Sequence, residues 1–387
     1  MDVVSIYVHI PFCRSKCAYC DFNSYAGLEH LFGQYVQALA REIGLASEGV
    51  SLQAKTIYLG GGTPTVLPLS LLEEVLSASR QTFRVANDVE ITVEANPGTV
   101  DSNNLAGLLN LGVNRLSLGV QSFDDRLLRL LGRIHTAAEA VESYNLARQA
   151  GFANINLDLI YGVPYQTLDQ WQSTLRETLN LQPDHLSLYA LTLEEHTPLA
   201  QQVACGEIPC PDDDLAADMY VSAEEMLAEA GYVHYEISNW AKRIPMTNDQ
   251  IPKMACQHNL ACWRNQPYLG FGAGAHSYFG GQRWHNVLSP TEYIARLNVG
   301  LEPRAHLEDI DRATEMAETM ILGLRLVEEG VGFEGFGRRF GKRLESLYEK
   351  ELRELRELGL VEVTAERLRL TRRGRLLGNE VFERFLP

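Results

Sequence analysis

Three cysteines stand close together near the start of the chain, in the segment IPFCRSKCAYCDF at residues 10–22. Cys13, Cys17 and Cys20 follow a strand-like apolar run, and no fourth cysteine lies nearby. Zinc sites usually gather four Cys or His ligands, commonly as two separated pairs. Thiolates also hold iron–sulfur clusters, and a [4Fe–4S] cluster with only three of them keeps one iron open for another ligand. The spacing favours such a cluster over a zinc knuckle or three buried bystander thiols.

Glycine and polar residues follow other strand-like runs. The segment GGGTPT at 60–65 is a loop in which backbone N–H and C=O groups can approach a ligand closely. Glu94 and Asp158 suit hydrogen bonds from ribose hydroxyls or an ammonium group, whereas Arg133 suits a carboxylate. Tyr19 stands between two of the cysteines, where its ring can stack beside an adenine. Each of these residues, taken singly, is also an ordinary polar residue at the rim of a sheet.

An alternation of short β-rich runs and helical patterns between residues 3 and 191 positions these side chains. This rhythm is typical of βαβ units around a parallel sheet, and it predicts an α/β fold with an incomplete (β/α)6 barrel. Function collects at the C-terminal ends of barrel strands, and the chemically unusual residues all come there. The expected strands are 3–10, 55–61, 89–95, 114–120, 153–162 and 184–191.

The rest of the chain has a different character. We expect an amphipathic helix at 212–231, a strand at 232–238 and an irregular segment at 240–290. Helices near 310–326 and 342–358, followed by a β-hairpin, predict a winged-helix-like ending that serves packing and interaction. We therefore expect a core barrel (1–235), a linking segment (236–304) and a C-terminal helical, winged-helix-like domain (305–387).

Composition limits the classes of function. Of the 387 residues 45% are hydrophobic and 22% charged, as in a globular protein. The net charge of -16 argues against a general nucleic-acid binder, because phosphate contacts need a basic face. Seven cysteines, an odd number, suit a reducing compartment and a metal site. No apolar run reaches the roughly 18 residues of a transmembrane helix, so we expect a cytoplasmic protein with no transmembrane segment.

The cysteine spacing C-x3-C-x2-C on a loop after the first strand resembles the radical SAM superfamily. The likeness extends along most of the chain, to a group that contains oxygen-independent coproporphyrinogen III oxidase and the HemW-like haem chaperones. The segments that carry it are YLGGGTPT (58–65), VEANPGT (93–99), RLSLGVQSFDDRLLRLLGR (115–133), NLDLIYGVPYQT (156–167) and HNLACWRNQPYLGFGAGAHSY (258–278).

The resemblance implies a [4Fe–4S] cluster on Cys13, Cys17 and Cys20, with S-adenosylmethionine at the open iron. Three further cysteines, Cys205, Cys210 and Cys256, have no counterpart role. The family's S-adenosylmethionine contacts carry over to Tyr7, Tyr19, Gly61, Gly62, Thr63, Glu94, Gln121, Arg133 and Asp158.

Three features favour the chaperone over the oxidase. Phe22 stands where the oxidase has a fourth cysteine, and few residues precede Tyr7, whereas the oxidase has an N-terminal extension. The segment HNLACW resembles the H-N-x-x-Y-W haem-binding motif, so His258 is the candidate axial ligand and Trp263 a candidate cover for the porphyrin. Cys262 stands where the motif has a tyrosine. Its thiol either binds the haem iron or is a buried side chain with no role in binding. After His258, His276 in the segment GAGAHSY is the second histidine candidate for an axial ligand.

The resemblance thus implies a haem chaperone that binds haem b and delivers it to acceptor haemoproteins such as respiratory enzymes. Delivery at the cytoplasmic membrane surface would be transient, and no nucleic-acid partner is expected. Homodimer formation stays open. We expect no net catalysis and no catalytic residue, with the cluster acting as a structural or dimerisation element. The alternatives are oxidative decarboxylation of coproporphyrinogen III, which belongs to haem biosynthesis, or radical chemistry on another substrate.

Overall fold

The computed structural model describes residues 2–46, 51–243 and 251–387. The chain forms two compact units. The barrel unit comprises Met1–Ala223 and Pro267–Glu308, and the C-terminal unit comprises Glu224–Gln266 and Asp309–Pro387. The three-part division predicted above follows changes in sequence character and stays a prediction. No helix within the described residues is long and apolar enough to cross a membrane.

A parallel sheet forms the centre of the barrel unit, with strand order β1-β4-β5-β6-β7-β8. All residues of β6 are buried, as is typical of a parallel strand covered on both faces. The predicted α/β fold with six successive barrel strands is confirmed. The strands are β1 Asp2–Ile10, β4 Leu52–Gly61, β5 Arg84–Ala95, β6 Arg115–Gln121, β7 Ile155–Tyr161 and β8 His185–Ala190.

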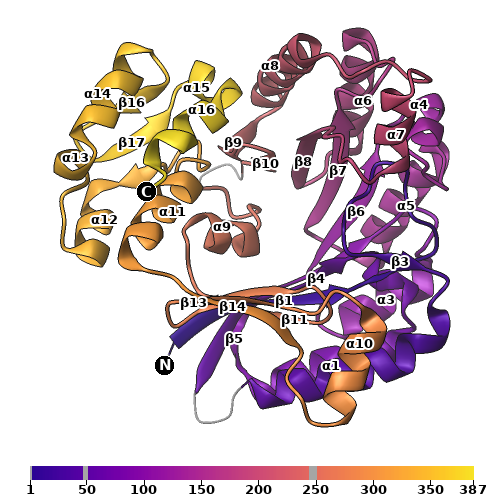
Figure 1. Ribbon diagram of the computed structural model, residues 1–387. Helices are drawn as coiled ribbons and strands as arrows, with labels where there is room; N and C mark the ends of the chain where they lie inside the picture. Colours follow the sequence, from indigo (N-terminus) through magenta and orange to yellow (C-terminus); the bar gives the residue numbers. More distant parts are fainter. Residues whose placement is uncertain (1, 47–50, 244–250) are drawn as a thin grey trace. The chain divides into compact units, whose positions relative to one another are not determined.

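Helices connect these strands, and Figure 1 shows α1, α3, α5 and α6 along one face of the sheet. Two of them begin with capping boxes, which satisfy free backbone N–H groups: Thr136 with Glu139 in α5, and Thr167 with Gln170 in α6. Gly151 ends α5 at φ 111°, a conformation that favours glycine. The helices are α1 Phe32–Leu45, α2 Leu69–Thr82, α3 Ser102–Asn110, α4 Asp125–Leu130, α5 Ala137–Ala150, α6 Leu168–Leu181, α7 Pro198–Ala204 and α8 Asp213–Glu229.

Further strands extend the sheet on the other side of β1. Strand β11 pairs with β1 in parallel, and β12, β13 and β14 follow in order. The expectation of an irregular segment at 240–290 is therefore wrong for much of it, while 244–250 lie outside the described residues. These strands are short, so the pairing of β11 with β1, and of each further strand with its neighbour, stabilises them more than local alternation does. Their bounds are β11 Tyr268–Phe271, β12 His276–Phe279, β13 Gln282–Asn286 and β14 Arg304–Asp309.

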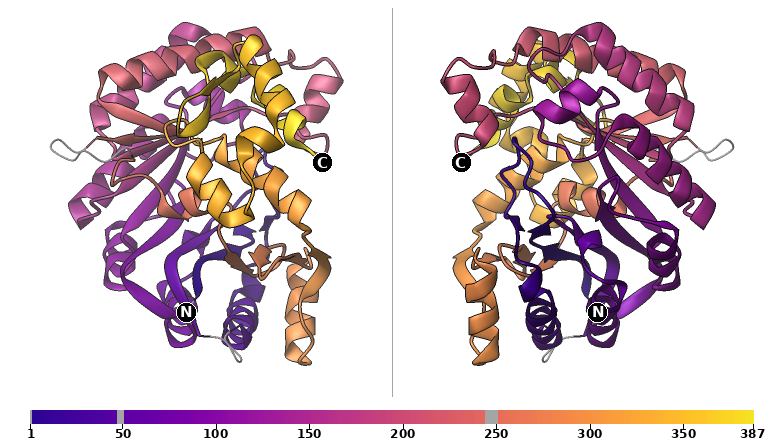
Figure 2. Two further views of the ribbon diagram at one scale, coloured as in Figure 1. Left: turned by 90° about the vertical axis from the view of Figure 1, so that its left-hand side faces the viewer. Right: turned by 90° about the vertical axis from the view of Figure 1, so that its right-hand side faces the viewer.

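Two smaller features complete the barrel unit. A short parallel ribbon joins β2 (Phe12–Cys13) to β3 (Tyr25–Ala26), and it holds the start of the cysteine loop. Helix α10 (Pro290–Asn298) lies beside α1 (Figure 1, Figure 2), where the Tyr35 and Tyr293 rings pack 5.2 Å apart. The 3-10 helices of this unit are Glu29–Leu31 and Pro64–Val66.

The C-terminal unit ends in a helical domain with a small antiparallel sheet of order β15-β17-β16. The predicted hairpin is confirmed as β16 and β17, and the sheet packs on buried side chains that include Leu324, Leu355 and Leu368. This matches the predicted winged-helix-like ending. The elements are β9 Tyr232–Glu236, β10 Asn239–Lys242, α9 Gln257–Trp263, α11 Arg312–Gly323, β15 Val331–Gly332, α12 Phe333–Phe340, α13 Leu344–Leu347, α14 Glu349–Glu357, β16 Val361–Val363, β17 Arg367–Leu370, α15 Arg372–Leu376, α16 Gly378–Phe382 and the 3-10 helix Glu383–Phe385.

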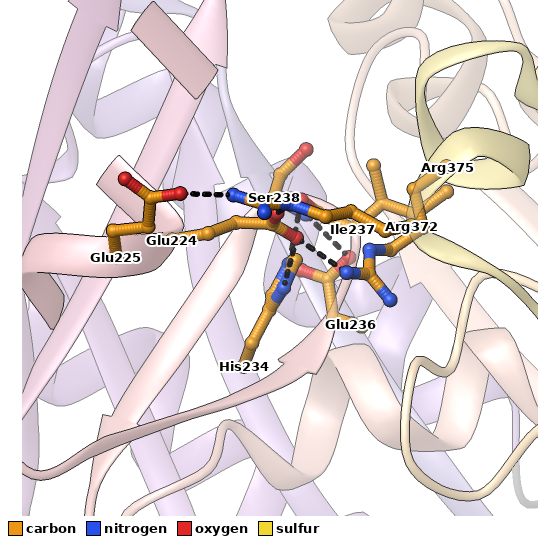
Figure 3. A network of polar contacts seen from close by, with 8 residues as sticks. All are labelled: Glu224, Glu225, His234, Glu236, Ile237, Ser238, Arg372 and Arg375. Carbon is orange, nitrogen blue, oxygen red and sulfur yellow. Dashed lines mark hydrogen bonds and ion pairs between the residues drawn. The ribbon is translucent and has the colours of Figure 1, made fainter. Parts of the chain in front are cut away.

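A buried ion-pair network ties α8, β9 and α15 together within the C-terminal unit (Figure 3). The Glu224 carboxylate lies 2.7 Å from Arg375 Nη2, 3.1 Å from Arg372 Nε and 3.2 Å from His234 Nδ1. Burial alone would raise the pKa of Glu224, but His234 and Arg375 outweigh it and lower that pKa. Burial also lowers the pKa of His234, against the opposing effect of Glu224. His234 further stacks on the Trp240 ring, with centroids 4.0 Å apart.

Both shifts predict that acid destabilises this unit. A folded-state pKa of His234 below 6.5 means that its stability contribution is complete above pH 6.5 and declines as the pH falls. The contribution of Glu224 is present above its ordinary pKa of 4.5 and is lost as the pH falls through the folded value. We expect the melting temperature, followed by circular dichroism, to fall between pH 7 and pH 4.

The variant Glu224→Gln sharpens this prediction. At pH 7 it should lower the free energy of unfolding by about 3 kcal/mol, because it leaves the buried Arg375 charge uncompensated. Glu225→Gln is the matched control, since its ion pair with Arg372 is exposed (61% and 50%) and should contribute less than about 1 kcal/mol. Urea unfolding measures both variants, and equal losses of stability would contradict the role of the buried network.

Candidate functional site

The cysteine loop leaves β1 and brings the three thiols together in the barrel unit. Cys13, Cys17 and Cys20 are each half-buried. Burial raises the pKa of the Cys13 and Cys20 thiols, and the charge of neighbouring cysteines adds to this effect. Thr63 Oγ1 donates to Cys13 Sγ at 3.6 Å, and Cys20 Sγ lies 4.0 Å from Ser24 Oγ. The three thiols thus lie near enough to feel one another's charge, and their joint role as cluster ligands stays a prediction.

A chain of hydrogen bonds connects two of the cysteines through Asn96. The Asn96 amide donates to Thr63 Oγ1 at 2.7 Å, and Thr63 in turn donates to Cys13. Arg133 Nη2 donates to Asn96 Oδ1 and, at 2.7 Å, to Gly119 O, while its Nη1 donates to Cys17 Sγ at 3.2 Å. Asn96 follows β5 in the segment EANPGT, so its place at a strand end was the available signal, but the sequence analysis passed it over.

The donor set agrees in kind with an iron–sulfur cluster. The loop offers thiols, and Thr63 and Arg133 donate hydrogen bonds to their sulfurs, which favours the thiolate form. Among the described residues, no three His, Cys, Asp or Glu side chains are placed to hold one metal ion. In a [4Fe–4S] cluster each thiolate binds a different iron, so the sulfurs need not converge on one point. A cavity of about 20 Å³ beside the loop is lined by Cys17, Thr63, Asn96 and Arg133, among others.

The glycines after β4 allow the loop to lie directly against its neighbours. Gly61 has φ +110°, and an added Cβ would come within 2.5 Å of the His9 ring. An added Cβ on Gly62 would come within 2.5 Å of Phe12 O, in the cysteine loop. A larger side chain at either position would push the two segments apart. Close packing therefore accounts for both glycines, and their contact with S-adenosylmethionine stays a prediction.

Two half-buried carboxyl groups belong to strands β5 and β7. Glu94 accepts from Tyr58 OH at 2.7 Å and from Gly61 N at 3.1 Å. Burial raises the pKa of Glu94 to about 7, with a further contribution from Asp158. Burial also raises the pKa of Asp158, which accepts from Ser117 Oγ at 3.0 Å and from an Asn156 amide at 2.8 Å. The charge of Glu94 therefore changes near neutral pH, and Asp158 offers a second acceptor whose pKa burial raises.

Aromatic side chains line the same region. Tyr7 stacks on Tyr58 with centroids 6.2 Å apart, and its hydroxyl lies 2.9 Å from His9 Nδ1. Burial raises the pKa of Tyr19, which lies near enough to Arg133 and the cysteines to feel their charge. Gln121 is buried with φ 67°, an uncommon conformation for a non-glycine residue. The residues predicted to contact S-adenosylmethionine thus all belong to the barrel unit; which of them bind it stays a prediction.

The predicted haem motif lies in the other unit. His258 sits on α9 and is buried, with 7% of its surface exposed. Trp263 packs partly buried against Leu260 and Leu326, under the Arg325 guanidinium at 4.6 Å from the ring centroid. Burial raises the pKa of Cys262 to about 11, so this thiol is protonated at neutral pH. His258 thus belongs to the C-terminal unit and the cysteine loop to the barrel unit. The second histidine candidate, His276, lies on β12 of the barrel unit.

The link through Asn96 makes a prediction for the metal-free protein. Asn96→Ala removes the acceptor of Arg133 and the donor to Thr63, so the cysteine loop should open more readily. A lost hydrogen bond of about 1–3 kcal/mol corresponds to amide exchange that is roughly five- to 150-fold faster at residues 12–20. Hydrogen–deuterium exchange mass spectrometry measures this. Asn103→Ala, on the exposed face of α3, is the matched control, and unchanged exchange at 12–20 in Asn96→Ala would refute the link.

Comparison with family models supports this description of the barrel unit. A model described as the radical SAM superfamily matches residues 7–178, a span that contains the cysteine loop and both carboxyl groups. A second model, described as the HemN C-terminal domain, matches residues 310–377.

Similar proteins cover nearly the whole chain. The heme chaperone HemW of Bacillus subtilis (strain 168) is 37% identical over 384 residues, which is 99% of each chain. The heme chaperone HemW of Escherichia coli (strain K12) is 34% identical over 393 residues, covering 99% of this chain and 98% of that protein. Among solved structures, the coproporphyrinogen III oxidase HemN from Escherichia coli, a radical SAM enzyme, superposes with a TM-score of 0.83 at 24% identity, covering 99% of this chain and 90% of that one. The last likeness shows a shared fold.

Proposed function

Because the chain belongs to the HemW family of radical SAM proteins, we propose that it is a haem chaperone, which binds haem b and passes it to acceptor haemoproteins. The observation that carries this proposal is the similarity to heme chaperones over 99% of the chain. Respiratory enzymes are the proposed acceptors, met transiently at the cytoplasmic membrane surface. Cytoplasmic localisation and homodimer formation belong to the same proposal.

In this proposal Cys13, Cys17 and Cys20 hold a [4Fe–4S] cluster, which when bound offers one iron to S-adenosylmethionine. Arg133 and Thr63 stabilise two of the thiolates by donating to their sulfurs. The hydrogen bonds that Asn96 makes with both donors keep them oriented.

The carboxyl groups of the barrel unit supply the polar end of the proposed S-adenosylmethionine site. Glu94 and Asp158 are both half-buried, and an ionised carboxylate there accepts strongly from a hydroxyl or an ammonium group. Tyr7 and Tyr19 offer aromatic rings suited to stacking. Gln121 and the glycine loop complete the proposed contacts.

Haem is the proposed cargo, and His258 its proposed axial ligand. A neutral imidazole binds haem iron well. Cys262 is the poorer candidate, because its raised pKa of about 11 keeps the thiol protonated and only a thiolate binds metal strongly. Trp263 lies on the same short helix and offers an apolar ring to a porphyrin.

The shared fold with coproporphyrinogen III oxidase supports a second candidate function, oxidative decarboxylation in haem biosynthesis. Phe22, at the position of the oxidase's fourth cysteine, favours the chaperone. Anaerobic incubation of the reconstituted protein with S-adenosylmethionine, a reductant and coproporphyrinogen III separates the two. The chaperone proposal expects unchanged substrate, and accumulation of protoporphyrinogen would overturn it.

Iron and sulfide analysis tests the proposed cluster. Cys17→Ser should lose most of the iron and acid-labile sulfide of an anaerobically reconstituted preparation, because it removes one of only three thiolates. Cys205→Ser, which changes an exposed thiol, should retain the wild-type content. Zinc in place of iron, or equal iron in both variants, would contradict the proposed ligands.

A hemin titration followed in the Soret region tests the proposed cargo ligand. His258→Ala should bind one equivalent of hemin per chain less than the wild type, because it removes the axial imidazole. Cys262→Ala is the matched control and should bind as the wild type does. If His258→Ala and the wild type bind the same amount, His258 is not the ligand.

A further inference from the structure

A bulge distorts the end of strand β6, where Gln121 is a proposed contact of S-adenosylmethionine. The register with β7 shifts between Gly119 and Gln121, so Val120 is an extra residue in the strand. Gln121 has φ 67°, and Ser122 N donates to Val120 O at 2.9 Å. A three-residue turn with a positive φ at its central residue is rare and strained. Such strain persists only where neighbouring groups hold the backbone in place.

The carbonyl groups of the bulge are held by side chains of one short segment between α4 and α5. Arg133 Nη2 donates to Gly119 O at 2.7 Å, and His135 Nε2 lies 3.0 Å from Val120 O. A carbonyl oxygen can only accept, so Nε2 carries the proton of the His135 ring. Two successive carbonyl groups of the distorted strand end are thus bonded to side chains from outside the sheet.

The His135 ring is suited to holding a backbone carbonyl. It is buried, with 4% of its surface exposed. Burial lowers the pKa of His135 to about 4, and the charge of Arg133 adds to this effect, so the ring is neutral near pH 7. Among the described residues its Nδ1 has no hydrogen-bond partner, so the bond to Val120 is the one that orients the ring. His135 therefore fixes the bulge and brings no charge to the site.

The same short segment also contacts the cysteine loop. Ala18 N donates to Leu131 O at 3.0 Å, and Arg133 Nη1 donates to Cys17 Sγ at 3.2 Å. Toward its other end the segment leads into α5, whose start is fixed by a capping box. Residues 131–135 therefore join the cysteine loop to the end of β6 and are themselves held at both ends.

The Gln121 amide lies beside groups that hold the cysteine loop. A Cβ added to Gly119 would come 3.0 Å from Gln121 Nε2. The same Cβ would lie 2.7 Å from Asn96 Oδ1 and 3.4 Å from Arg133 Nη2. The three side chains thus converge on one glycine, and a larger residue there would collide with them. An amide in this position can donate to an oxygen of a ligand or accept from its amino group.

We propose that His135 is a positioning residue for S-adenosylmethionine, which holds the bulge of β6 so that the Gln121 amide faces the ligand. This inference rests on the proposed cofactor site, in which Gln121 is a contact. His135 acts through Val120 and need not touch the ligand itself. Because residues 131–135 also bond to the cysteine loop, one segment would set the position of the amide relative to the cluster.

Equilibrium dialysis of S-adenosylmethionine against the anaerobically reconstituted protein tests this role. His135→Leu should raise the dissociation constant about tenfold, because the strained turn relaxes and the amide turns away. His135→Gln should bind nearly as the wild type does, because its amide nitrogen can take the place of Nε2. Both variants should keep the wild-type content of iron and sulfide, since neither changes a thiol or a donor to sulfur. His196→Leu, which changes an exposed histidine, is the matched control and should bind normally.

A double-mutant cycle shows whether the effect passes through Gln121. Gln121→Ala removes the amide and should weaken binding by itself. In the Gln121→Ala background, His135→Leu should leave the dissociation constant nearly unchanged, because no amide remains to be positioned. A second loss of the same size as in the wild-type background would overturn the proposed role.

The outcomes separate this inference from the proposed function. A wild type that holds the cluster iron but does not bind S-adenosylmethionine refutes the proposed cofactor site itself. A wild type and a His135→Leu variant that bind it equally well leave that site standing and overturn the role of His135. If circular dichroism shows that His135→Leu does not fold, His135→Asn replaces it, because the asparagine nitrogen corresponds to Nδ1 and not to Nε2. Equal affinities of His135→Asn and His135→Gln then overturn the role.

Discussion

The contact of Arg133 with Cys17, together with the Asn96 link to Thr63 and Cys13, is the interaction on which the candidate site depends. A guanidinium within a fold must find acceptors, and here it uses a sulfur, a side-chain amide and the Gly119 carbonyl. The parallel sheet brings these groups together, because Thr63 follows β4, Asn96 follows β5 and Gly119 lies in the neighbouring strand β6. The cysteine loop is thus positioned by the sheet and not by its own short sequence.

Much of the barrel unit follows from local sequence. The barrel strands contain short β-rich runs, and the one over β6 is buried throughout, as a parallel strand covered on both faces requires. The capped starts of α5 and α6 are visible as Thr136 with Glu139 and Thr167 with Gln170. Strands β11 to β14 were missed because they are short and owe their stability to pairing, β11 with β1 and each further strand with its neighbour. Their place in the sheet is a property of the tertiary fold, which no local pattern expresses.

The sequence predicts which residues belong to the candidate site better than it predicts which of them contact each other. Cysteine spacing and strand-end carboxyl groups identify Cys13, Glu94 and their neighbours. The sequence analysis expected Arg133 to face a carboxylate and gave Asn96 no role, because an amide carries no charge that signals chemistry. The structure shows that these two residues bond to each other, and that Gly61 and Gly62 have a packing reason for being glycine.

The account separates a cofactor region from a cargo region, since the cysteine loop belongs to the barrel unit and His258 to the C-terminal unit. Its central claim is that three thiolates leave one iron of the cluster open. Mössbauer spectroscopy of protein reconstituted with 57Fe, before and after addition of S-adenosylmethionine, tests this most directly. We predict that one iron in four changes its isomer shift and quadrupole splitting while the other three do not. Four equivalent irons that ignore the added ligand would contradict the account.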